Sequence, residues 1–432
     1  MAGFSRRGML IGGGAALAAA ALPFGRRSRR ARAAEGSGKA RNLILIVAGG
    51  GWDVTYALDP KPGLVTVDAP NGSLEMFGDI PVFTDPSRPN VAAYFDKYAA
   101  LTATLSGVQV QSVSHIQCSR RMLTGDRSAG GADLGAITAH THGRDLPVPY
   151  MVFGNRAFPG PLAGSSGRVG ITNQLKALLS PIEAYPPRPG SPAVGTSFNP
   201  DQADRDLIRD YTKARAERVR ATRGSLGHNA ARIQDYVDAI DRGDALRPHV
   251  NGLGPRGVTL ALDAQSIFAI DAINEGITHS VLVEDPESWD THNNNADQNR
   301  LHNQLFGALT LVMDELTTRN GQDSGNKMID ETVVMVLSEM SRTPRLNGGA
   351  GKDHWPSTSC MVMGGGVAGH ARYGGTDDLQ QARLVDFDSG QPDDGNGQGL
   401  MAENVLAAVL DMVGIDPAPY LPGVEPLHAL IA

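Results

Sequence analysis

Cysteine is scarce in this sequence of 432 residues, which contains only two. Cys118 and Cys360 lie in separate motifs, so the sequence does not predict a small fold held together by a framework of disulfides. An exported protein could still oxidise two thiols. Pairing of Cys118 with Cys360 therefore stays open from the sequence alone.

Long, strongly apolar runs are also absent. The apolar stretch near the N-terminus, Met9–Phe24, is rich in Ala and Gly and is too short and too weakly apolar for a stable membrane span. It follows the paired Arg6 and Arg7 and precedes an A-x-A cleavage pattern at residues 31–33. This order predicts that residues 1–33 are a Tat-type signal peptide, with the Tat export machinery as a partner and a periplasmic or secreted location. Retention of the leader as a membrane anchor is the alternative.

An excess of positive charge is the third absence. Residues 1–33 contain seven of the 39 basic residues and no acidic residue, which leaves 32 basic residues against 46 acidic ones. This strongly acidic balance argues against nucleic acid and against anionic membrane surfaces as general partners.

What the chain does contain is the pattern of an α/β protein. Hydrophobic residues make up 41% and charged residues 20%, which is ordinary for a globular domain. Short continuous apolar runs, typical of buried parallel strands, alternate with helical segments, so we predict an α/β sandwich with a mostly parallel central sheet over residues 41–432. The runs lie within residues 41–53, 279–285, 332–339 and 358–366, and the clearest helical segments are 299–318 and 399–415.

The middle of the chain has a different composition. Residues 180–202 are rich in Pro, Gly and Ser, which predicts a linker or a surface excursion. Residues 203–247 are strongly charged, with acid–base pairs at helical spacing, and we expect a mainly helical insert that covers the core.

Chemically capable side chains follow several of the predicted strands. In open α/β sheets, functional groups collect beyond the carboxyl ends of the strands. The candidates are Asp53 after the first run, then Ser114, His115 and Arg120, then Asp290 and His292, then Glu339 and Arg342, and finally Asp353 and His354. Repeated carboxylates and imidazoles at one edge of a sheet favour a metal site or a polyacid site.

Some of these groups also have a purely structural interpretation. Asp53 is equally suited to cap the N-terminus of a helix. His292 could be a loop histidine satisfied by its neighbours, and Glu339 with Arg342 could form a structural ion pair. Asp353 and His354 are harder to interpret in this way, because they lie in a glycine-rich loop and ordered polar loops usually serve sites.

The motifs occur in the order found in a known superfamily. "NLILIVAGGGWD", "SHIQCSRRMLTGDR", "SWDTHNNN", "VVMVLSEMSRTP" and "GKDHWPSTSCMVMGGG" follow one another along the chain. This order resembles the alkaline phosphatase and sulfatase superfamily. The phrases "WDTH", "SEMSRTP" and "DH" resemble more closely an exported bacterial family known as domain of unknown function 1501. The resemblance implies a three-layer α/β sandwich and two divalent metal ions that clamp the oxygens of an ester during hydrolysis.

The resemblance also implies roles for individual residues. Asp290, His292 and His354 would hold one divalent ion, which could be zinc, calcium, magnesium or manganese. Asp53 and Glu339 would support a second ion, with His115 as a further candidate ligand. Asp353 is also a candidate metal ligand. Ser114 or a metal-bound water would be the nucleophile, and Arg342 or Arg120 would orient the anion.

The sequence departs from the superfamily pattern in three places. Gly49 and Gly50 occupy positions where an aspartate is usual at the end of the first strand. Cys118 is displaced from the position of the modified sulfatase cysteine, and Met340 stands where a histidine ligand is expected; a thioether is a poor ligand for hard divalent ions. The leading hypothesis is an exported metal-dependent hydrolase of a phosphate or sulfate ester, with a small anionic or polysaccharide-type substrate. The alternative is a non-catalytic exported binding or scaffold protein with a degenerate metal site.

Overall fold

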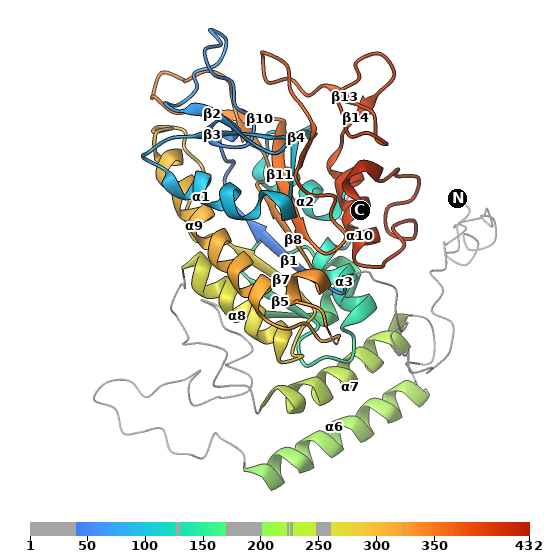
Figure 1. Ribbon diagram of the computed structural model, residues 1–432. Coiled ribbons are helices and arrows are strands. Elements are labelled where there is room, and N and C mark those ends of the chain that lie inside the picture. The colour runs from blue at the N-terminus through green and yellow to red at the C-terminus, as the bar shows by residue number, and fades with distance from the viewer. Residues whose placement is uncertain are drawn as a thin grey trace, which may run out of the picture. The chain divides into compact units, whose positions relative to one another are not determined.

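The computed structural model describes residues 40–126, 130–169, 201–222, 224, 228–247, 261–323 and 325–432. Its centre is an eight-stranded sheet with the strand order β12-β4-β11-β8-β1-β7-β5-β6 (Figure 1). The strands are β1 (Asn42–Val47), β4 (Thr102–Gln109), β5 (Tyr150–Phe153), β6 (Ser166–Val169), β7 (Ser280–Glu284), β8 (Thr332–Leu337), β11 (Ser357–Gly364) and β12 (Ala371–Gly374). All of them run in one direction except β11, which pairs antiparallel with both β4 and β8. The predicted mostly parallel sheet is confirmed.

The sheet is covered by helices on both faces. One face carries α1 (Pro89–Tyr98), α8 (Leu262–Asn274) and α9 (Asp297–Thr318), and the other carries α2 (His115–Thr124), α3 (Leu134–His142) and α10 (Ala402–Met412). The strand β1 shows why the strands are continuous apolar runs in the sequence. Its side chains alternate between two buried faces: Ile44 and Ile46 pack in one core, whereas Leu43, Leu45 and Val47 pack in the other. The three-layer sandwich is therefore confirmed.

The register of the strands gathers several loops at one edge. Val47 at the end of β1 is level with Glu284 at the end of β7 and with Leu337 at the end of β8. The loops that follow these strands therefore leave the sheet side by side. Because β11 runs the opposite way, it is its beginning that lies at this edge, and the residues that precede β11 join the same loops.

Smaller elements decorate this core. A two-stranded sheet of β9 (Ser341–Arg342) and β10 (His354–Trp355) pairs Arg342 with His354 and so closes the glycine-rich loop between them. The other pairs are β2 (Ser73–Phe77) with β3 (Ile80–Thr84), and β13 (Leu384–Val385) with β14 (Gln398–Gly399). The short 3-10 helices are η1 (Val54–Tyr56), η2 (Ala99–Leu101), η3 (Gly160–Ser165), η6 (Met328–Glu331) and η7 (His428–Leu430).

Two long helices, α6 (Gln202–Thr222) and α7 (His228–Leu246), lie in the charged middle of the chain. Residues 1–33, where a signal peptide is predicted, and most of the stretch 180–202 lie outside the described residues. Within the part of the chain that the structure describes, no helix is long and apolar enough to cross a membrane.

Candidate metal centre

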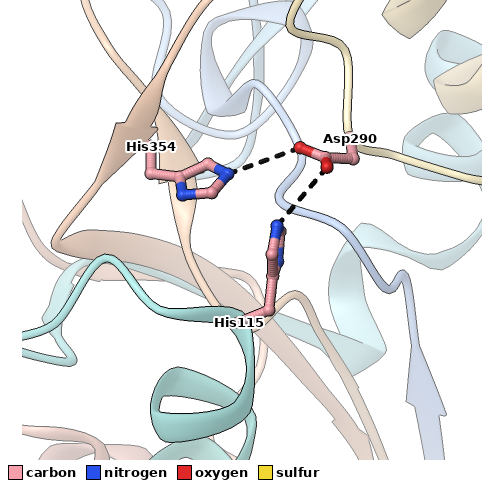
Figure 2. A group of neighbouring side chains, drawn as sticks. All are labelled: His115, Asp290 and His354. Carbon is pink, nitrogen blue, oxygen red and sulfur yellow. Dashed lines mark hydrogen bonds and ion pairs between the residues drawn. The ribbon is translucent and has the colours of Figure 1, made fainter.

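The carboxylate of Asp290 is the point on which the candidate side chains converge. His115 Nε2 lies 3.4 Å from Asp290 Oδ2, and His354 Nε2 lies 3.4 Å from Asp290 Oδ1 (Figure 2). Donor atoms of these three residues all lie within 4.8 Å of one another, which is a spacing that a single metal ion can bridge. The carboxylate is 37% exposed, so the group is open to solvent.

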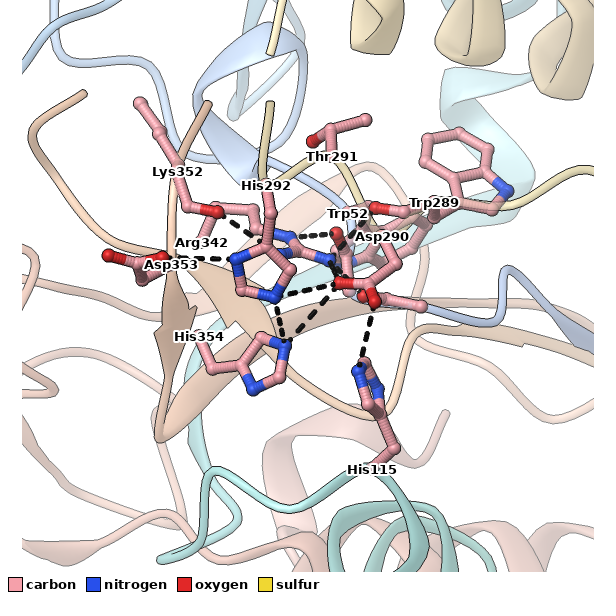
Figure 3. Close-up of polar contacts among 12 residues, drawn as sticks. Trp52, His115, Trp289, Asp290, Thr291, His292, Arg342, Lys352, Asp353 and His354 are labelled. Atoms are coloured by element: carbon pink, nitrogen blue, oxygen red, sulfur yellow. Dashed lines mark hydrogen bonds and ion pairs between the residues drawn. The ribbon is translucent and has the colours of Figure 1, made fainter. Parts of the chain in front are cut away.

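A third imidazole joins this group. His292 Nε2 lies 3.2 Å from Asp290 Oδ1 and 2.9 Å from His354 Nε2 (Figure 3). The predicted trio of Asp290, His292 and His354 is thus brought together, and His115 stands on the other oxygen of the same carboxylate. We call these four residues the histidine cluster.

Each histidine of the cluster makes a hydrogen bond through Nδ1, the ring nitrogen that does not face Asp290. Nδ1 of His115 contacts Glu339 Oε1 at 2.9 Å, and Nδ1 of His292 contacts Asp353 Oδ1 at 3.0 Å. Nδ1 of His354 contacts the backbone carbonyl of Val113 at 2.8 Å. All three partners are acceptors, so the hydrogen-bond network assigns the proton to Nδ1. The three Nε2 lone pairs then face Asp290, which is the arrangement of metal-ligating histidines and their supporting acceptors.

The electrostatics of the cluster require a cation. In the tautomers assigned above, two Nε2 lone pairs and a carboxylate oxygen face one another with no hydrogen between them. Such a set is repulsive unless a proton or a metal ion lies among them. Three imidazoles and one carboxylate suit zinc and similar divalent metals better than magnesium or calcium, which prefer oxygen ligands.

The local backbone explains how these side chains meet. His115 is the first residue of α2, whose N-cap is Ser114, and His354 begins β10. Gly50 has φ +129°, and a Cβ at this position would lie 2.6 Å from the backbone nitrogen of Asp290. A glycine is therefore required here, because the β1 loop and the Asp290 loop approach each other backbone to backbone.

Arg342 lies buried beneath the cluster and positions it. Its Nη2 donates to Asp290 Oδ1 at 2.6 Å, its Nε donates to the carbonyl of Gly51, and its Nη1 donates to the carbonyl of Lys352. The guanidinium has no exposed surface. Burial raises the pKa of Asp290, but the hydrogen bond and the charge of Arg342 outweigh it and lower the pKa below its ordinary value. Arg342 is thus placed to hold Asp290, and because it is fully buried it is not free to orient an anion, which is the role that the resemblance implied for it.

Glu339 contacts a histidine of the cluster and does not face Asp290 itself. Its fully buried carboxylate accepts hydrogen bonds from His115 Nδ1, from Arg156 Nη1 at 2.9 Å, and from the backbone nitrogen of Gly50 at 3.0 Å. Burial raises the pKa of Glu339, but these partners outweigh it and lower the pKa. With its lone pairs in use, the carboxylate is placed as the partner of His115 instead of as the predicted ligand of a second ion. Asp353 likewise contacts His292 from the outer side.

Asp53 is not brought into the cluster. Its carboxylate is completely buried, with Oδ2 2.8 Å from Nζ of Lys352 and 2.7 Å from Nδ2 of Asn295. Its Oδ1 accepts from the backbone nitrogen of Thr55, which makes Asp53 the N-cap of η1. Asp53 therefore caps the N-terminus of a helix, as its structural interpretation proposed. Both of its carboxylate oxygens already have protein partners.

The remaining candidates lie at the edge of the cluster or away from it. The Ser114 side chain is exposed and makes no capping hydrogen bond to α2. Arg120 lies over the ring of Phe158, at 5.6 Å from its centroid. Both cysteines are free and buried, and burial raises the pKa of Cys118 to about 11, which is opposite to what a reactive thiol requires. Met340 is fully buried in the core and takes no place among the ligands.

One charged residue of this edge, Arg156, has no place among the candidates predicted from the sequence. Arg156 follows β5, and its partner Glu284 is the last residue of β7. Arg156 Nε donates to Glu284 Oε1 at 2.6 Å, and Arg156 Nη1 donates to Glu339. The signal that could have identified Arg156 is the short apolar run "YMVF", which predicts a buried strand and is followed by Gly154, Asn155 and Arg156.

Comparison with known proteins identifies a family. A family described as "Protein of unknown function (DUF1501)" matches residues 40–388. No curated protein matches the sequence. Among solved structures, Ps i-CgsB in complex with k-i-k-neocarrahexaose aligns with a TM-score of 0.41 and 12% identity, over 90% of this chain and 78% of that one.

Two further structures are similar at the same level. The lipoteichoic acid synthase LtaP from Listeria monocytogenes aligns with a TM-score of 0.36 and 9% identity, over 90% of this chain and 74% of that one. The phosphonate monoester hydrolase SpPMH from Silicibacter pomeroyi aligns with a TM-score of 0.34 and 10% identity, over 89% of this chain and 77% of that one.

Proposed function

The chain belongs to the DUF1501 family of proteins of unknown function, and we propose that it is an exported metal-dependent hydrolase of phosphate or sulfate esters. One observation carries this proposal: three histidine Nε2 atoms face the Asp290 carboxylate, and each Nδ1 is tied to an acceptor. A preorganised set of this kind fits a divalent metal ion.

The proposed ligands are His115, Asp290, His292 and His354. When bound, the ion would supply Lewis-acid stabilisation of the charge that develops on an ester oxygen. The chain's own residues do the rest. Arg342 fixes the Asp290 carboxylate, while Glu339, Asp353 and the Val113 carbonyl fix the three rings, so little reorganisation is needed when the ligand arrives.

The surroundings favour an anionic substrate. The helix α2 begins at His115, so the partial positive charge of its N-terminus lies at the cluster. Ser114 is the hydroxyl next to His115 in the chain, and it is exposed and not used as a cap. Ser114 is therefore the side chain that we assign as the candidate nucleophile, with water as the alternative. A small ester or a polysaccharide-type substrate is compatible with an open site.

The proposal is tested by metal analysis and by turnover on the same samples. Purified protein should carry divalent metal and hydrolyse an aryl phosphate or an aryl sulfate. His354→Ala should lose both, whereas His428→Ala, which removes a half-exposed histidine paired with Asp388 outside the cluster, should keep both. Absence of bound metal in protein purified without chelator, after reconstitution with zinc and with manganese, would sink the proposal.

A non-catalytic binding protein is the second candidate, and the placement of Glu339 and Met340 favours it. Neither residue is available as a ligand, so the described residues do not provide the ligands for the second ion of a two-metal hydrolase. Metal content without hydrolysis of either aryl ester would support this candidate, because the cluster would then serve binding alone.

A further inference from the structure

Arg156 is held at the edge of the histidine cluster by groups from three other segments. Its Nε donates to Glu284 at the end of β7, and its Nη1 donates both to Glu339 after β8 and to Ser119 Oγ of α2 at 3.0 Å. Two carboxylates that fix one guanidinium from two sides leave it little freedom. Arg156 is thus a preorganised cation at the carboxyl edge of the sheet.

This cation is coupled to the cluster through one shared oxygen. Glu339 Oε1 lies 2.9 Å from Arg156 Nη1 and 2.9 Å from Nδ1 of His115. A second metal ion bound by Glu339 would have to displace one of these contacts. The two carboxylates Glu284 and Glu339 are instead both paired with the one guanidinium.

Gly49 makes room for the guanidinium. A Cβ at Gly49 would lie 2.6 Å from Nε, 2.8 Å from Cζ and 2.9 Å from Nη2 of Arg156. These distances are shorter than van der Waals contact, so the guanidinium lies directly on the glycine backbone. Arg156 can therefore occupy this position only because residue 49, just after β1, is a glycine.

One edge of Arg156 remains open. Its Nε and Nη1 have partners, whereas no hydrogen bond or ion pair joins Nη2 to any residue in the described ranges. The side chain is 26% exposed. The contrast with Arg342 is direct, because Arg342 is fully buried and uses all three of its nitrogens on the protein.

We propose that Arg156 is the second cation of this site: it stands in place of a second metal ion and binds a tetrahedral oxyanion, phosphate or sulfate, through Nη2. This inference rests on the proposed function, which supplies the first cation. It assigns to Arg156 the anion-binding role for which the sequence suggested Arg342 or Arg120.

Metal stoichiometry tests the first half of the proposal. Wild-type protein reconstituted with zinc should hold one ion per chain by elemental analysis. Two ions per chain would overturn the statement that Arg156 replaces the second ion. A protein that holds neither zinc nor manganese would contradict the proposed function, whereas the anion-binding half would still be tested by the next measurement, which needs no metal.

Calorimetric titration of metal-free protein with inorganic phosphate, and separately with inorganic sulfate, tests the second half. Arg156→Gln should weaken binding of the preferred anion about tenfold or more, because a charge-assisted hydrogen bond is lost. Arg156→Lys should retain part of the affinity, since it keeps the charge but lacks the fixed Nη2 donor. Arg383→Gln is the matched control: it removes an exposed arginine that also pairs with a carboxylate, Asp394, and should leave affinity unchanged.

Circular dichroism and the melting temperature would establish that the variants are folded. Equal anion affinity in wild type and folded Arg156→Gln would overturn the assignment of Arg156, and so would the absence of binding of either anion to wild type. If Arg156→Gln does not fold, the Arg156→Lys result decides: full wild-type affinity in that variant would contradict recognition through Nη2 of the guanidinium.

Discussion

Asp53 and Asp290 were both candidate ligands, and the structure gives them opposite surroundings. The Asp53 carboxylate is completely buried and is neutralised by Lys352, Asn295 and Thr55. The Asp290 carboxylate is partly exposed; Arg342 pairs with it from the buried side, but on the open side it faces three histidine lone pairs that have no charged partner of their own. A buried carboxylate persists only when it is paired, whereas a preorganised but uncompensated set of donors is suited to a ligand. The state of compensation, not the residue type, therefore separates the scaffold from the site.

One residue joins the two regions. Arg342 donates through Nη2 to Asp290 and through Nη1 to the carbonyl of Lys352, at 2.6 and 3.1 Å. The scaffold around Asp53 and the histidine cluster thus share a buried guanidinium. Substitutions on either side should have different signatures, which provides several ways to test the comparison.

The largest effect is expected from breaking the buried pair. Lys352→Met should lower the free energy of unfolding by about 3–5 kcal/mol, because it leaves the Asp53 charge buried without its partner. Urea unfolding in the presence of chelator measures this. The double variant Lys352→Met with Asp53→Asn should recover most of the loss, since no charge then remains. A loss below about 1 kcal/mol in the single variant would show that the Asp53 region is not a charge-paired scaffold.

Removing a ligand from the cluster should have the opposite effect: a large loss of zinc affinity with little change in the stability of the metal-free protein. His292→Ala should weaken zinc binding about 100-fold or more, because one of four proposed ligands is lost. It should change the stability of the metal-free protein little, since the ring is partly exposed and removing it relieves the contact between two lone pairs. A zinc titration followed by the melting temperature reports both quantities. An equal stabilisation of wild type and His292→Ala by zinc would contradict the ligand assignment.

A smaller effect is expected from the supporting layer. Asp353→Ala should weaken zinc binding about 10-fold to 100-fold, because the tautomer and orientation of His292 lose their anchor. Asp388→Ala is the matched control, since Asp388 is an exposed aspartate that contacts a histidine outside the cluster. If both variants bind zinc as wild type does, the Nδ1 contact of His292 does not support a metal ligand.

Much of this site could be predicted from the sequence, and particular residues show where the prediction stopped. The sandwich follows from apolar runs such as residues 42–47, and the order of loops follows from parallel strands. Spacing places Asp290, His292 and His354 after strands, but it cannot show whether a carboxylate points inward or outward. Asp53 and Glu339 therefore had the same sequence signal as Asp290, although their oxygens are occupied by partners more than 200 residues away.

The roles of the two arginines, Arg156 and Arg342, could not be predicted from the sequence either. Arg342 lies in the phrase "SEMSRTP", on which the resemblance rests, and Arg156 lies outside the quoted phrases. Arg342 is nevertheless fully buried, whereas the Arg156 side chain is 26% exposed. The difference depends on register: β5 ends beside β7, and this places Arg156 next to Glu284. Register between strands that are distant in the chain is set by packing of the whole sheet and leaves no local signal.

The smallest effect, and the one that sharpens the comparison most, is the acid dependence of stability. Burial raises the pKa of Asp53, but the charge and hydrogen bond of Lys352 outweigh it and lower the pKa below its ordinary value of 3.8. The stabilisation from this pair is therefore complete above about pH 4 and is lost as the pH falls below that value. Each proton taken up only on unfolding contributes at most about 1.4 kcal/mol per pH unit.

Comparison of two proteins isolates that contribution. Asp290 and Glu339 also have lowered pKa values and titrate in the same acid range, but they do so equally in wild type and in the double variant Lys352→Met with Asp53→Asn. Urea unfolding between about pH 2.5 and pH 6, with chelator present, should therefore show a shallower loss of stability in the double variant. Parallel profiles would mean that Asp53 titrates alike in the folded and unfolded chain. The Lys352–Asp53 contact would then contribute no net charge stabilisation to the buried scaffold.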